Sequence, residues 1–136
     1  MSSEKLQVYT DGGARGNPGP AGIGVVIKDN DKIVKECSEY IGETTNNQAE
    51  YQAIVKGLQE AKKLGVKELD CFLDSELVVN QLNRKFKIKD QKIGKWFIKI
   101  HNLLLGFKKV NFHHIYREEN KAADRLVNEA IDRKIK

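Results

Sequence analysis

The order in which strand-like and helical patterns follow one another constrains the fold of this chain more than any other feature. Residues 6–10, 22–28 and 32–41 have the alternating or continuous apolar and β-branched character of strands. A turn is expected at Asp29-Asn30-Asp31, between the second and the third of these segments. Three consecutive strands with short connections predict an antiparallel meander.

A long helix is predicted to open after Asn46 and Asn47 and to stop at Gly65. Between these points apolar and small residues recur at a spacing of three and four. Those residues are Ala49, Ala53, Ile54, Gly57, Leu58, Ala61 and Leu64. They predict one helix face packed against a sheet.

The remainder of the chain predicts strands at residues 68–73 and 110–116, and helices at residues 75–83, 93–105 and 119–133. The inward positions of the last helix are Ala123, Leu126, Val127, Ala130 and Ile131. The resulting order is βββαβααβα. Right-handed crossovers make the later strands parallel, so we expect an α/β fold with a five-stranded mixed sheet flanked by helices.

A chain of 136 residues is long enough for one hydrophobic core and short for two, so residues 1–136 are expected to form a single domain. Apolar residues make up 40% and charged residues 32%, a balance that excludes a disordered chain. There is no apolar signal-peptide core at the N-terminus and no apolar run of membrane-spanning length. We therefore expect a cytoplasmic protein without a membrane partner, and a monomer as the default state.

The charge and the cysteines restrict the partners only weakly. The net charge of +5 favours polyanions, although many proteins without such partners are equally basic. Cys37 and Cys71 fit no paired metal-ligand spacing and are too few to hold a secreted fold together, so both are expected to be reduced, buried thiols.

Four acidic residues occupy positions at which their side chains should converge. Asp11 is expected to close the first strand and Asp74 the fourth, while Glu50 and Asp124 lie in the first and last predicted helices. Glu50 and Asp124 share the helical spacing of apolar neighbours, so each should project from the edge of a packed face. Crowded carboxylates resist ionisation, and they are the hard oxygen ligands that Mg²⁺ and Mn²⁺ prefer. Together the four predict a metal site, although any one of them alone is more often a helix cap.

Four short motifs contain these acids. The motifs are Tyr9-Thr10-Asp11-Gly12-Gly13 with Gly16-Asn17-Pro18-Gly19-Pro20, Thr45-Asn46-Asn47-Gln48-Ala49-Glu50, Asp74-Ser75, and Glu119-Asn120 with Ala123-Asp124. In them the chain resembles the type 1 ribonucleases H, and the resemblance spans nearly its whole length. It implies the ribonuclease H fold and an endonuclease that hydrolyses the RNA strand of RNA/DNA hybrids.

The resemblance also implies roles for individual residues. Asp11, Glu50, Asp74 and Asp124 would be the catalytic residues and the ligands of two Mg²⁺ or Mn²⁺ ions with substrate bound. One ion would lower the pKa of an attacking water and the other would stabilise the leaving 3′ oxygen, the pair about 4 Å apart, giving 5′-phosphate and 3′-hydroxyl products.

The expected substrate contacts are Gly12, Asn17, Thr45, Asn46, Asn47 and Arg117. By resemblance, the three asparagines would reach sugar hydroxyls and base edges, which is how RNA is told from DNA. Thr45 would hold a phosphate of the DNA strand. Helix capping alone also explains Thr45, Asn46 and Asn47.

A basic stretch follows the second predicted helix and resembles a reduced form of the family's groove for the DNA strand. The candidate groove residues are Arg84, Lys85, Lys87, Lys89 and Trp96, with Lys92, Lys95 and Lys99 nearby. The alternatives are a solvated helix surface for the lysines and a core position for Trp96.

The chain departs from many relatives in one loop. The segment Tyr116-Arg117-Glu118, just before the last acidic helix, contains no histidine, as in archaeal and some bacterial members. His113 and His114 fall earlier, inside a strand, where alternation sends them to opposite faces. Neither is expected to be catalytic.

Other functions are kept as alternatives. The glycine-rich residues 12–19 lack the ending of a phosphate-binding loop, which argues against an NTPase. A catalytically weak hybrid-binding module, another nuclease on the same scaffold, and an α/β protein whose acids are only caps all stay open. So do the preferred metal, cleavage of double-stranded RNA or RNA–DNA junctions, and whether the domain is free-standing or part of a longer protein.

Overall fold

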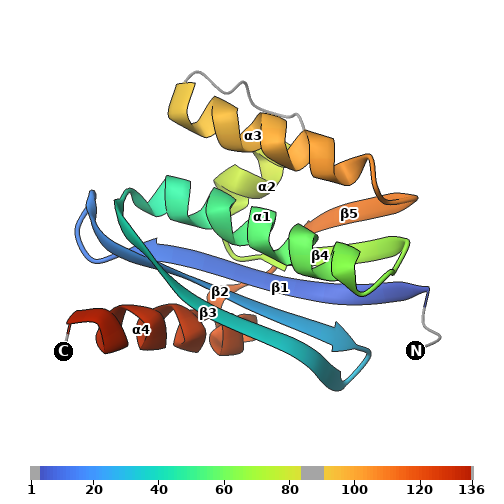
Figure 1. Cartoon of the computed structure of the whole chain (residues 1–136), viewed down its shortest axis with the longest axis horizontal. Coiled ribbons are helices and arrows are strands. Elements are labelled where there is room, and N and C mark those ends of the chain that lie inside the picture. Colours follow the sequence, from blue (N-terminus) through green and yellow to red (C-terminus); the bar gives the residue numbers. More distant parts are fainter. Residues whose placement is uncertain (1–3, 84–90, 136) are drawn as a thin grey trace.

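The computed structural model describes residues 4–83 and 91–135 and contains one five-stranded sheet (Figure 1). The strands are β1 (Lys5–Ala14), β2 (Gly19–Asp29), β3 (Lys32–Thr44), β4 (Glu68–Leu73) and β5 (Lys109–His114), in the spatial order β3-β2-β1-β4-β5. The first three pair antiparallel, and β1, β4 and β5 pair parallel. The predicted mixed sheet and order of elements are therefore confirmed.

The helices cover both faces of the sheet. They are α1 (Asn46–Lys63), α2 (Glu76–Leu82), α3 (Gln91–Leu104) and α4 (Lys121–Ile135), with a short 3₁₀ turn, η1 (Arg117–Glu119), before the last. In Figure 1, α1, α2 and α3 lie on one side of the sheet and α4 on the other. No helix in the described part of the chain is long and apolar enough to cross a membrane.

The main core lies between the sheet and α1. Apolar side chains of β1, β2, β4 and α1 fill it, among them Leu6, Val8, Val25, Ile27, Ile54, Leu58 and Leu69. On the opposite face all five predicted inward residues of α4 are buried. α4 can approach β2 closely because Gly24 has no side chain, and a Cβ there would lie 2.2 Å from the carbonyl oxygen of Ala123. That approach places the neighbouring Asp124 beside the sheet.

Several predicted boundaries were wrong. Asp11 does not close the first strand, because β1 continues to Ala14 in antiparallel pairing with β2. The parallel pairing of β1 with β4, in contrast, ends at Tyr9 opposite Phe72. Asp11 is therefore inside a strand on one side and just past the end of a ladder on the other.

The boundaries of the later elements differ less from the predicted ones. β5 ends at His114 and not at residue 116, and α4 begins two residues later than predicted, after η1. Leu64 ends α1 and is exposed, so it does not belong to the packed face. Both cysteines are free; Cys71 is buried as predicted, whereas Cys37 is only half-buried.

Candidate active site

Three of the predicted acids meet at the end of the β1–β4 ladder. Asp11, Glu50 and Asp74 each have a carboxylate oxygen within 4.8 Å of the others. Asp124 adds a fourth carboxyl, hydrogen-bonded to that of Asp11. The structure thus brings together all four acids that the sequence singled out.

These acids line an open hollow of about 310 Å³. Its other walls come from the end of β1 and the residue that follows it, the start of α1, η1 and α4. The complete lining is Asp11, Gly12, Gly13, Ala14, Arg15, Asn46, Glu50, Asp74, Arg117, Asp124, Val127, Asn128 and Ile131. No serine, cysteine, lysine or histidine belongs to the described lining.

Strand register and one glycine explain the convergence. The β1–β4 register, continued by two residues, sets Asp11 opposite Asp74. The next residue, Gly12, is buried against the first turn of α1, and a Cβ there would lie 2.2 Å from the carbonyl oxygen of Ala49. Only glycine allows this approach, which brings Glu50 to the strand carboxylates. The structure thus shows a packing role for Gly12, and its predicted contact with substrate stays a prediction.

The electrostatics of the cluster are unfavourable without a cation. Burial raises the pKa of Asp11 to about 8, and the charges of Asp74, Asp124 and Glu50 add to the effect. Burial likewise raises the pKa of Glu50 to about 8, with Asp74 contributing, while Arg117 and a hydrogen bond from Ser75 act in the opposite direction. A hard divalent cation fits this donor set because it removes the repulsion and prefers carboxylate oxygens.

Two arginines line the hollow. Arg15 is already held by α4, with one guanidinium nitrogen 2.7 Å from Asp132 and another 3.2 Å from the side-chain oxygen of Asn128. Arg117 is exposed on η1, at the mouth of the hollow. Arg117 was predicted to belong to the site and Arg15 was not, because the sequence does not reveal that the β1–β2 connection folds against α4.

Asn120 is a second residue at the site whose role sequence reasoning missed. Its side chain is 1% exposed, and its Nδ2 donates to Oδ2 of Asp74 at 2.9 Å and to the carbonyl oxygen of Thr10 at 3.0 Å. The signal available in the sequence was its place in the Glu119-Asn120 motif, which by itself suggests no partner.

The predicted asparagines form a hydrogen-bonded connection beside the acids. The backbone N–H of Asn46 donates to Oδ1 of Asn17 at 3.0 Å, and the N–H of Ala14 donates to Oδ1 of Asn46 at 2.8 Å. Thr45 caps α1 by accepting from the N–H of Gln48 at 3.2 Å. Asn46 lines the hollow, whereas Asn47 is half-buried outside its lining.

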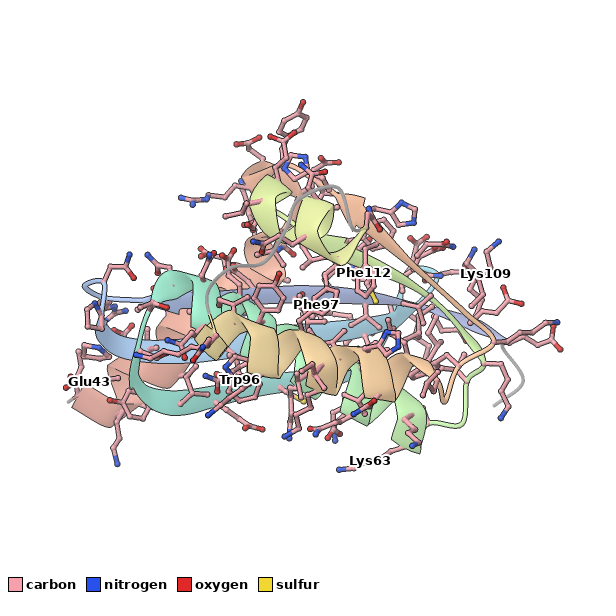
Figure 2. The ribbon with its side chains drawn as sticks, turned by 90° about the horizontal axis from the view of Figure 1, so that it is seen from above. Glu43, Lys63, Trp96, Phe97, Lys109 and Phe112 are labelled. Carbon is pink, nitrogen blue, oxygen red and sulfur yellow. The ribbon has the colours of Figure 1, made fainter. Side chains whose placement is uncertain are left out.

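The predicted groove is described only in part. Arg84, Lys85, Lys87 and Lys89 lie outside the described residues. Trp96, labelled on α3 in Figure 2, is half-buried and packs against the core, and its role in a groove for DNA stays a prediction.

A second hollow, of about 300 Å³, is lined by Gln48, Lys92, Lys95, Trp96 and Lys99. The ammonium of Lys99 lies 5.7 Å from the centroid of the Trp96 ring. Because Gln48 belongs to the same first turns of α1 as Glu50, this basic hollow and the acidic hollow share one helix end.

The two histidines lie away from the acidic hollow. His113 is paired with Asp70 at 3.0 Å and stacks on Phe72, and His114 contacts Tyr116 edge-on. Both side chains are exposed and neither lines the hollow. The described lining of the acidic hollow contains no histidine.

Comparisons with known proteins identify relatives of this chain. The family model described as "Reverse transcriptase-like" matches residues 9–130. A bifunctional protein of Mycobacterium tuberculosis is 40% identical over 130 residues, which cover 94% of this chain and 36% of that protein. The chain thus spans only about a third of that relative's length. The ribonuclease HI of Halobacterium salinarum is 39% identical over 129 residues, 94% of this chain and 65% of that protein.

Solved structures extend the likeness to the whole fold. LC11-RNase H1 in complex with an RNA/DNA hybrid has a TM-score of 0.93 at 45% identity, covering 96% of this chain and 99% of that one. RNase H1 of Halobacterium salinarum has a TM-score of 0.92 at 38% identity, covering 95% and 98%. The family model matches residues 9–130 of this chain, these relatives and structures match nearly all of it, and the four acids line one hollow. The chain therefore belongs to the type 1 ribonuclease H family.

Proposed function

We propose that this chain is a metal-dependent endoribonuclease that hydrolyses the RNA strand of RNA/DNA hybrids, leaving 5′-phosphate and 3′-hydroxyl ends. The main support is the cluster of Asp11, Glu50 and Asp74 within 4.8 Å, with Asp124 beside it, in one surface hollow. The likeness to a ribonuclease H1 described in complex with a hybrid supports the substrate class.

The four carboxylates would hold the metal. The chemistry supplied by a pair of Mg²⁺ or Mn²⁺ ions bound there is a lowered pKa for an attacking water and stabilisation of the leaving 3′ oxygen. Water is the proposed nucleophile, because the described lining of the hollow contains no serine, cysteine or lysine. The raised pKa of Glu50 makes this carboxyl a group that can accept or release a proton near neutral pH before the substrate is bound.

The asparagines are proposed to recognise the RNA strand. Each side-chain oxygen of Asn17 and Asn46 accepts a backbone N–H, which holds the amide in place. Their Nδ2 groups make no hydrogen bond within the described part of the chain, so they can donate to 2′-hydroxyls or base edges. Arg117 at the mouth of the hollow is proposed to attract the phosphate next to the cleaved bond.

The basic hollow on α3 is proposed to contact the DNA strand. Lys95 and Lys99 provide charges for phosphates, and Trp96 provides an apolar surface for a sugar. Because this hollow and the acidic hollow share the first turns of α1, a duplex bound there would place one strand at each of them.

The test is cleavage of an end-labelled RNA/DNA hybrid in Mg²⁺ or Mn²⁺, beside single-stranded RNA, duplex DNA, branched DNA, duplex RNA and an RNA–DNA junction. Asp74→Asn, purified in parallel, controls for contaminating nucleases. Cleavage restricted to the RNA strand of the hybrid, abolished by a chelator and by the substitution, is the expected result. Hybrid binding without cleavage in either metal would instead identify a binding module, and selective cleavage of branched DNA would identify another nuclease on this scaffold.

A further inference from the structure

Asn120 stands at the start of α4 but does not use its side chain as helix-initiating asparagines usually do. Its carbonyl oxygen accepts the N–H of Asp124 at 3.1 Å, which is the first bond of the helix. At such positions an asparagine oxygen normally accepts a backbone N–H of the first turn. Here Oδ1 is buried and has no hydrogen-bond partner among the described residues. The side chain therefore forms its hydrogen bonds away from the helix and does not cap the first turn of α4.

The side chain of Asn120 is bonded to β1 and to the end of β4, the two segments that bear Asp11 and Asp74. Both Nδ2 bonds cross long stretches of sequence: one reaches Oδ2 of Asp74 at 2.9 Å and the other the carbonyl of Thr10 at 3.0 Å. The β1–β4 ladder has already ended at Tyr9 and Phe72. The amide therefore joins the strands where backbone pairing no longer does.

Asn120 thus links three of the four carboxylates. It bonds Asp74 directly, it bonds the carbonyl of the residue before Asp11, and its own carbonyl begins the helical turn that ends at Asp124. An amide is neutral, so it orients Asp74 without cancelling the negative charge that a cation requires. A lysine in the same place would neutralise the carboxylate.

We propose that Asn120 is a positioning residue that sets the spacing of Asp74 relative to Asp11 and Asp124, and thereby the affinity of the site for its divalent cation. This inference rests on the proposed function. Groups that orient metal ligands typically contribute 10–100-fold in metal affinity or activity, and Asn120 is expected to fall in this range.

The experiment compares Asn120→Ser and Asn120→Ala with wild type. Serine is favoured at helix starts but too short to reach Asp74, so it removes the link while suiting the helix end. The matched control is Asn111→Ser, because Asn111 also donates an amide to an aspartate, Asp70 at 3.2 Å, outside the site. Mn²⁺ affinity is measured by calorimetry without nucleic acid, and kcat and KM are measured on the hybrid, all below the unfolding temperature of each variant.

At least one Asn120 variant that remains folded should bind Mn²⁺ about 10–100-fold more weakly and lose kcat by a similar factor, with KM for the hybrid changed less than about threefold. Asn111→Ser should match wild type in all three quantities. A purely structural role would lower the melting temperature and leave Mn²⁺ affinity and kcat of the folded variant within threefold of wild type, which would overturn the inference.

The two proposals fail separately. If wild type binds Mn²⁺ but cuts no hybrid, the proposed function is wrong, and the Mn²⁺ affinity of Asn120→Ser still decides the positioning role. If neither Asn120 variant folds, the chain needs Asn120 for folding and the inference is rejected in favour of a structural role.

Discussion

Two aspartates four residues apart, Asp70 in β4 and Asp74 just after it, belong to clusters with opposite electrostatics. Asp70 is 17% exposed and accepts from Lys5 at 2.9 Å, His113 at 3.0 Å and Asn111 at 3.2 Å. Burial acts to raise its pKa, but these hydrogen bonds and the charge of Lys5 outweigh it and hold the pKa at about 2.

Around Asp74 the partners are other acids. Burial and like charges raise the pKa of both Asp11 and Glu50 to about 8, and the one direct side-chain donor to Asp74 is the neutral amide of Asn120 within the described residues. The comparison shows how one strand supports both arrangements. A carboxylate that is paired with cationic side chains of the chain stabilises the fold. Carboxylates that lack such partners are available to bind an external cation.

The largest expected difference between the clusters is in catalysis. Asp74→Asn should lower kcat by about 10³-fold or more, because a lost ligand removes several kcal/mol of transition-state stabilisation. Asp70→Asn should stay within about threefold of wild type. Initial rates on the hybrid at saturating Mg²⁺ measure both, and equal losses would remove the functional distinction between the clusters.

In the absence of metal, replacing Asp11 and replacing Asp70 should change the free energy of unfolding in opposite directions. Asp11 has a raised pKa in the folded state, so the folded protein holds protons that the unfolded chain releases, and stability contributed here falls as pH rises from about 4 to about 8. Asp11→Asn should therefore raise the free energy of unfolding at pH 8, by roughly 1–3 kcal/mol, and change it little at pH 4.

Asp70 behaves in the opposite way. Its pKa is depressed, so its contribution is present above about pH 4 and is lost as pH falls toward 2. Asp70→Asn should lower stability at pH 7 by roughly 1–2 kcal/mol. Urea unfolding in a chelator measures Asp11→Asn at pH 4 and pH 8 and Asp70→Asn at pH 7. Destabilisation by Asp11→Asn at pH 8 would contradict the account of the acidic hollow.

Metal binding near neutral pH should release protons, because Asp11 and Glu50 must ionise to bind a cation. Calorimetric titration with Mn²⁺ in two buffers of different ionisation enthalpy should give different apparent enthalpies at pH 7 and converge above about pH 9. Asp70→Asn should leave the released proton number unchanged. A buffer-independent enthalpy at pH 7 would mean that the hollow is already ionised.

The smallest effect is expected at His113. Replacing it by glutamine removes an exposed partner of Asp70 and should cost less than about 1 kcal/mol, because ion pairs near the surface contribute little. Cleavage rates should be unchanged. A large loss of activity in His113→Gln, with the melting temperature preserved, would place this histidine in the catalytic process and blur the separation of the two clusters.

Much of the fold was predictable because its signals are local. The periodicity of residues 49–61 indicated α1 and its buried face, and the inward residues of α4 were all confirmed. The four acids were found because short motifs and helix positions mark them. The strand ends were predicted less well: alternation along residues 6–10 gave no sign that β1 continues through Gly12 and Gly13 to Ala14.

The sequence by itself determined which elements form, in which order, and which four carboxylates are candidates for a metal, since each of these depends on neighbours within a few residues. Only the tertiary structure decided that Asp11 lies opposite Asp74, that Gly12 admits α1, and that Asn120 leaves its helix end to hold Asp74. It also decided that Asp70 forms an ion pair with Lys5, whereas Asp74 forms none with the residues that the structure describes. The physical reason is that register and long-range hydrogen bonds join residues 30 to 110 positions apart, as Asn120 joins Thr10, and no local pattern encodes such a pairing.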